Sequence, residues 1–147
     1  MLFRSTTFSH DGKLSAMIRQ SASTPPEVWA GPTGRWTQIT TLNAGVKAAW
    51  GDAHNFHWTN DNLQLEGFLT LPKDYTPGKT YPLIVTVHGG PSAACGPRWD
   101  PRGSGAVSAM GYFAFCPNPR GSYGQGEAFT QGNVKDFGGG EIGRAHV

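Results

Sequence analysis

Residues 81–91 read Tyr-Pro-Leu-Ile-Val-Thr-Val-His-Gly-Gly-Pro, and this stretch decides the fold. The run from Leu83 to Val87 is nearly continuous in apolar and β-branched residues, which is typical of a central parallel strand covered on both faces. His88 and two glycines follow the strand directly. Open α/β sheets bind their ligands at the carboxyl ends of such strands, so the sequence predicts an α/β fold with a functional loop at this point.

A second apolar run at residues 112–116 predicts another buried strand. Residues 101–110, between the two runs, predict a short helix, although Gly103 and Gly105 each cost a helix about 1 kcal/mol relative to alanine. The expected unit is therefore β-α-β with a right-handed crossover, and the two strands are expected to be parallel.

The region before residue 81 has the pattern of antiparallel strands. Residues 14–18, 27–30 and 36–40 predict three short strands at the spacing of one propeller blade. A blade cannot bury its faces alone, so neighbouring blades are expected upstream. Residues 56–59 and 63–71 predict a hairpin with one face buried.

The glycines after the first buried strand carry the chemistry that the sequence suggests. Glycine lets the main chain approach a substrate carbonyl, and a backbone N–H there can stabilise developing negative charge, a contribution of roughly 3 kcal/mol. His88, Gly89 and Gly90 are therefore candidates for an oxyanion hole. The alternative is a plain Gly-Gly-Pro turn.

Several motifs in order across residues 8–140 resemble one known family. They are Phe-Ser-x-Asp-Gly-Lys, Glu-Gly-Phe-Leu-x-Leu-Pro-Lys-Asp-Tyr, the stretch at 81–91, Pro-Asn-Pro-Arg-Gly-Ser at 117–122 and Asp-Phe-Gly-Gly-Gly at 136–140. Their order resembles that of prolyl oligopeptidase-like serine peptidases, in the acylaminoacyl-peptidase and dipeptidyl-peptidase branch. One departure from the family pattern is the glycine-rich helix segment, where the family usually has leucines.

The resemblance implies a domain organisation and an activity. Residues 1–50 would form the last blade of a β-propeller, and residues 51–141 the N-terminal part of an α/β-hydrolase domain. The full enzyme would hydrolyse peptide bonds of short peptides with a Ser-Asp-His triad, the serine standing on a Gly-x-Ser-x-Gly elbow.

The triad is not expected within this chain. Ser92, Ser104 and Ser122 lack the glycine pattern of the elbow and are interpreted as loop serines. Nucleophile, acid and base are therefore expected beyond residue 147, and the chain alone is expected to be inactive. Arg120, Gly121 and Ser122 are candidates for a loop that shapes the site. For Arg120 the alternative is an arginine that satisfies carbonyls in a glycine-rich turn.

Residues 142–147, Ile-Gly-Arg-Ala-His-Val, match the translation of a widely used sequencing adapter and are interpreted as an artefact to be excluded from the fold. The central sheet would then lack its later strands, so the edge of the strand at 112–116 is expected to be unpaired and apolar.

Composition narrows the remaining choices. The formal net charge of +2 arises from 12 basic and 10 acidic residues without any run, which disfavours nucleic acid and membrane partners. No cofactor or metal is expected. The spacing of Cys95 and Cys116 fits no metal motif and favours two free thiols over a disulfide. The five tryptophans are more typical of core and interdomain packing than of a binding platform.

Two other functions stay open: an esterase or lipase with the same glycine loop, and a propeller-based binding protein with an inactive hydrolase domain. The sequence leaves localisation, oligomeric state and the choice between endopeptidase and exopeptidase undecided.

Overall fold

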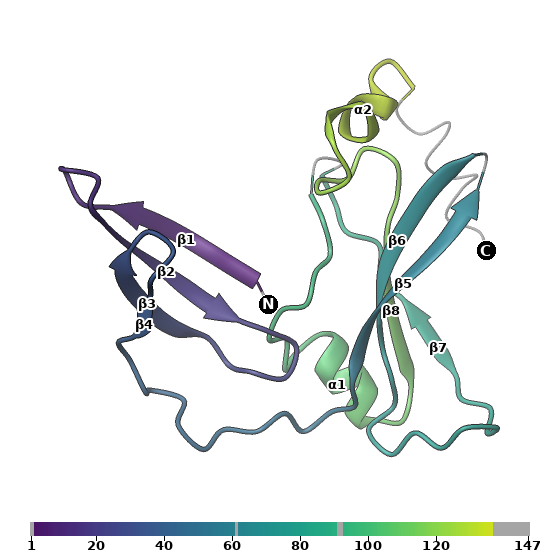
Figure 1. The fold of residues 1–147 in the computed structure, drawn as a ribbon. Helices are drawn as coiled ribbons and strands as arrows, with labels where there is room; N and C mark the ends of the chain where they lie inside the picture. The colour runs from purple at the N-terminus through teal and green to yellow at the C-terminus, as the bar shows by residue number, and fades with distance from the viewer. Residues whose placement is uncertain (1, 61, 91–92, 137–147) are drawn as a thin grey trace.

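The computed structural model describes residues 2–60, 62–90 and 93–136, which form two four-stranded sheets (Figure 1). The strands are β1 (Leu2–Phe8), β2 (Leu14–Gln20), β3 (Glu27–Pro32), β4 (Thr37–Gln38), β5 (Ala53–Asn60), β6 (Leu63–Thr70), β7 (Leu83–Val85) and β8 (Phe113–Asn118). The helices are α1 (Ser104–Ala109), α2 (Glu127–Thr130) and the 3₁₀ turn η1 (Gln131–Asn133). None of the helices described is long and apolar enough to cross a membrane.

The first sheet is an antiparallel meander in the order β1-β2-β3-β4. The three strands expected from the sequence are present, and β1 adds a fourth that the pattern did not reveal. The turn between β1 and β2 depends on Gly12, whose φ of 69° is costly for other residues. Met17 of β2 is 5% exposed and lies in the small core of this sheet.

The second sheet has the order β5-β6-β8-β7 and contains both strand directions. β5 and β6 form the predicted antiparallel hairpin, with Leu65 only 2% exposed. β7 and β8 are parallel and are connected through α1, so the expected β-α-β unit is confirmed. β8 also pairs antiparallel with β6, and its Ala114 is buried.

Two expectations about this sheet are wrong for the residues that the structure describes. β7 is a three-residue edge strand, not a central one, and Leu83, Ile84 and Val85 are 53%, 40% and 49% exposed. The open edge was expected on β8, but β8 lies between β6 and β7. β8 has no free edge, because the antiparallel β6 occupies its other side. Among the described strands, β7 pairs only with β8, so its outer edge is free.

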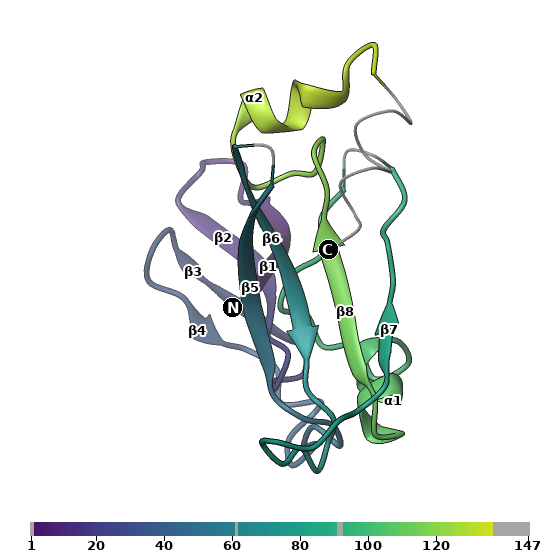
Figure 2. The ribbon, with the colours of Figure 1, turned by 90° about the vertical axis from the view of Figure 1, so that its right-hand side faces the viewer.

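The two sheets meet at a cluster around Trp50, which lies in the segment connecting them. The rings of Trp50 and Trp99 are 4.5 Å apart between centroids, and the Trp50 Nε1–H donates to the carbonyl of Ala22 at 3.0 Å. A Cβ added to Gly105 of α1 would lie 2.7 Å from Trp50 Cε3, which explains a glycine inside this helix. In the view turned by 90° the first sheet lies behind the second (Figure 2).

Candidate functional site

The loop that follows β7 begins at the carboxyl edge shared by the parallel strands β7 and β8. The backbone N–H of Thr86 donates to the carbonyl of Phe115 at 2.9 Å, which extends the pairing by one residue. Gly89 and Gly90 come next and are exposed. Gly90 has a φ of 143°, and a Cβ added to Gly89 would meet no atom within 4 Å. The main chain of both glycines is therefore open to a ligand.

His88 is half-buried and connects this loop to residue Ser122, which is fully buried. His88 Nε2 lies 3.0 Å from Ser122 Oγ, and the Ser122 hydroxyl donates to the carbonyl of Pro119 at 2.6 Å. The Pro119 carbonyl can only accept, so the Ser122 hydroxyl donates to it; the direction of the bond between Ser122 and His88 depends on the imidazole tautomer, because His88 Nδ1 also lies 3.2 Å from the carbonyl oxygen of Gly89. Among the predicted site residues, the structure thus brings His88 and Ser122 together.

Arg120 and Gly121 lie beside Ser122 but contact a different part of the chain. The Arg120 guanidinium forms an ion pair with Asp136, and its side chain is 16% exposed, against 52% for Asp136. The ion pair, rather than carbonyl binding, is thus the described contact of the charged group. Gly121 has a φ of 97°, and a Cβ there would collide with the Asn133 side chain. This packing holds residues 120–122 against η1.

Asn118, the last residue of β8, was missed by the sequence reasoning. It is fully buried, and its amide pairs with the main chain of Cys95. Cys95 N donates to Asn118 Oδ1 at 2.7 Å, and Asn118 Nδ2 donates to Cys95 O at 3.1 Å and to Glu66 Oε1 at 3.4 Å. The signal available in the sequence was an amide at the end of an apolar run, between Pro117 and Pro119.

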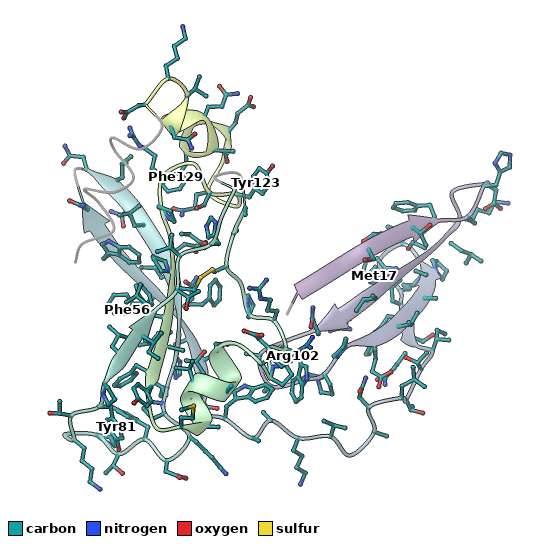
Figure 3. All side chains as sticks on the ribbon, turned by 180° about the vertical axis from the view of Figure 1, so that it is seen from behind. Met17, Phe56, Tyr81, Arg102, Tyr123 and Phe129 are labelled. Carbon is teal, nitrogen blue, oxygen red and sulfur yellow. A yellow bond between two sulfur atoms is a disulfide. The ribbon has the colours of Figure 1, made fainter. Side chains whose placement is uncertain are left out.

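The two cysteines form a disulfide, so the expectation of free thiols is wrong. Their Cα atoms are 6.1 Å apart although the residues are 21 positions apart in sequence. The return of the chain through α1 into β8 brings Cys116 beside the loop that carries Cys95, which is visible as a yellow bond between this loop and the sheet (Figure 3). Spacing in sequence could not show this contact, because it depends on the strand order.

The serines considered as nucleophiles have structural contacts where they are described. Ser104 begins α1 instead of lying in a loop, and its hydroxyl donates to Asp100 Oδ2 at 3.2 Å. Ser92 lies outside the described residues, and so do residues 142–147, the suspected adapter sequence. In the part that is described, no group of three or more histidine, cysteine or acidic residues could hold a metal ion.

Comparison with known proteins gives relatives by sequence and by fold. No protein-family profile matches the chain. Dipeptidyl-peptidase 5 of Aspergillus fumigatus is 32% identical over 92 residues, which are 60% of this chain and 12% of that protein. An acylaminoacyl peptidase solved in complex with Z-Gly-Gly-Phe-chloromethyl ketone has a TM-score of 0.78 at 24% identity, and a puromycin hydrolase has a TM-score of 0.78 at 19% identity. At these identities, the structural likeness concerns the fold.

Both structural matches cover 95% of this chain and 22% of the solved chain. The chain thus spans about a fifth of the length of these solved chains, and its matched residues span about an eighth of the curated relative. These homologues and structural neighbours are serine peptidases of the prolyl oligopeptidase family. The resemblance expected from the motifs is thus confirmed, and dipeptidyl-peptidases 5 are among the relatives by sequence.

Proposed function

We propose that this chain is part of a serine peptidase that hydrolyses short peptides. In this proposal β1–β4 form one blade of a β-propeller, and residues 51–141 are the N-terminal part of an α/β-hydrolase domain. The likeness to dipeptidyl-peptidases and to acylaminoacyl peptidase supports this division, and so does the presence of two separate four-stranded sheets, one after the other along this chain.

The observation that carries the proposal is the glycine loop at the carboxyl edge of β7. Gly89 and Gly90 are exposed, a Cβ added to Gly89 would meet no atom within 4 Å, and the φ of 143° at Gly90 suits glycine. Backbone N–H groups of such a loop can donate to the oxygen of a tetrahedral intermediate, which carries more negative charge than the substrate carbonyl. We therefore assign residues 88–90 to one half of the oxyanion hole.

Residues 120–122 support the half of the oxyanion hole at residues 88–90 through a contact with His88. Ser122 bonds to both His88 and the carbonyl of Pro119, so it fixes the histidine at the start of the loop. Arg120 and Gly121 hold the same segment through Asp136 and Asn133. In the proposed mechanism these residues shape the site, while the nucleophilic serine, the acid and the base of the Ser-Asp-His triad come from outside this chain.

The proposal is tested with the full-length protein that contains this chain. Chromogenic aminoacyl, dipeptidyl and acylaminoacyl substrates should be hydrolysed, and a serine-directed phosphonate should abolish the activity. A nitrophenyl ester serves as the comparison substrate, because an esterase would hydrolyse it and leave the peptides intact. The 147-residue chain, assayed in parallel, should show no activity above a boiled control. Full-length protein without phosphonate-sensitive peptide hydrolysis would contradict the proposal.

A further inference from the structure

The Cys95–Cys116 disulfide and four hydrogen-bonded contacts hold the segment after β7 to β8 and the turn beyond it. On one side of the two glycines, Thr86 N–H bonds to Phe115 O and His88 bonds to Ser122. On the other side, Tyr123 N donates to the carbonyl of Ala93 at 3.0 Å, and Asn118 binds the main chain of Cys95. The loop is therefore fixed on both sides of the glycines, and the partners come from β8 and from the turn at residues 122–123 that follows it.

Of these contacts, the one made by Asn118 places the strictest requirements on the side chain. Its side-chain amide uses both an acceptor and a donor toward one residue, in the way that a neighbouring strand would, and it is fully buried. Aspartate keeps the acceptor but has no donor for Cys95 O, and it places a second carboxylate beside Glu66. Leucine has a similar volume but removes both bonds and leaves the N–H and C=O of Cys95 without these buried partners.

We propose that Asn118 is a positioning residue for the oxyanion loop: by binding the main chain of Cys95 it holds the Gly89–Gly90 segment where its N–H groups meet the developing oxyanion. This inference rests on the proposed function, and it adds a residue that touches neither the substrate nor the reacting atoms. Because a donor must be placed within a few tenths of an ångström to stabilise a transition state, loosening the loop should reduce turnover more than substrate binding.

The test compares Asn118→Leu and Asn118→Asp with the wild type in the full-length protein, using a peptide substrate. We expect kcat to fall about 10- to 100-fold, in the range seen when a catalytic donor is displaced or removed, while KM stays within about twofold. Affinity for a peptide aldehyde, whose adduct with the serine places an oxyanion in the hole, should fall by the same factor as kcat/KM. Affinity for the product peptide should not change.

Ser108→Ala is the matched control. Ser108 is also fully buried and hydrogen-bonded, but its partners are Gly51 and Leu71, away from the loop. It should lower the thermal midpoint and leave kcat unchanged, so a general loss of stability can be told apart from a loss of positioning. If Asn118→Leu yields no soluble protein, Asn118→Asp serves, because it has the same size and shape as asparagine.

The outcomes separate this inference from the function on which it rests. A wild type without peptidase activity overturns the proposed function. An active wild type whose Asn118 variants keep kcat, or lose only substrate affinity, overturns the positioning role. The same holds if Ser108→Ala lowers kcat and aldehyde affinity as much as the Asn118 variants do. A fall in kcat and aldehyde affinity that is confined to the Asn118 variants supports the inference.

Discussion

Replacing Ser108 by alanine should destabilise the chain at the point where three segments meet. The Ser108 hydroxyl accepts from Gly51 N at 2.9 Å and donates to the carbonyl of Leu71 at 2.5 Å. Gly51 belongs to the connection between the sheets, and Leu71 follows β6 directly. With Ser108 itself fully buried, water cannot readily replace its hydroxyl.

The expected cost follows from the two partners that lose a bond. A buried donor or acceptor without a partner costs about 1–3 kcal/mol, so losing both should reduce the free energy of unfolding by about 2 kcal/mol or more. The thermal midpoint should fall by roughly 4–8 °C, since about 1 kcal/mol shifts it by roughly 2–4 °C in a domain of this size.

The assay is urea unfolding of Ser108→Ala, with Ser104→Ala on the same helix as the control. The Ser104 hydroxyl donates to the Asp100 carboxylate. Without that hydroxyl, the carboxylate still accepts from the backbone N–H groups of Gly103 at 3.1 Å and Ser104 at 2.8 Å. The control should therefore change the free energy by no more than about 0.5 kcal/mol. Equal effects of the two substitutions would refute the reasoning.

Three further predictions follow from other contacts. Replacing Cys95 and Cys116 together by serine should destabilise the chain by about 3 kcal/mol, because the disulfide closes a loop of 21 residues; urea unfolding measures this, and thiol titration of the wild type should detect no free thiol. Hydrogen bonds from the Thr40 hydroxyl and from main-chain N–H groups lower the pKa of Glu27 from its ordinary 4.5. The stability that this carboxylate contributes should be complete above pH 4.5 and lost as the pH falls below it, and Glu27→Gln should flatten that part of the profile of unfolding midpoint against pH; a wild-type slope retained in the variant would contradict this. In the full-length protein, Gly90→Val should lower kcat far more than it raises KM, and a loss confined to KM would remove Gly90 from the oxyanion hole.

Local pattern was sufficient to predict most strands, because alternation and β-branched runs report directly on burial. It failed where burial depends on partners that are distant in sequence. Residues 83–87 read as a central strand, but the position of β7 at the edge follows from the pairing of β8 with β6. Gly103 and Gly105 counted against a helix, although Gly105 of α1 is required by the ring of Trp50, about 55 positions earlier in the chain.

The candidate site was predictable to a similar extent. A strand end and two glycines were enough to make His88, Gly89 and Gly90 candidates, since both are local signals. The contacts of Cys95 with Asn118 and Cys116 could not be predicted, because they join a loop to a strand that follows about 20 residues later. An asparagine between two prolines shows no periodicity, and its contact with Cys95 forms only when the chain returns beside the loop.

The close, tilted indoles of Trp50 and Trp99 also give this protein an optical signal of its own. Two such chromophores 4.5 Å apart between centroids and inclined by 57° couple electronically, and coupled indoles give a paired positive and negative band in circular dichroism. Trp50 precedes β5 and Trp99 precedes α1, so the band depends on the seam between the two sheets. A spectroscopist can therefore follow the opening of that seam during unfolding without attaching a label, and can separate it in time from the loss of either sheet.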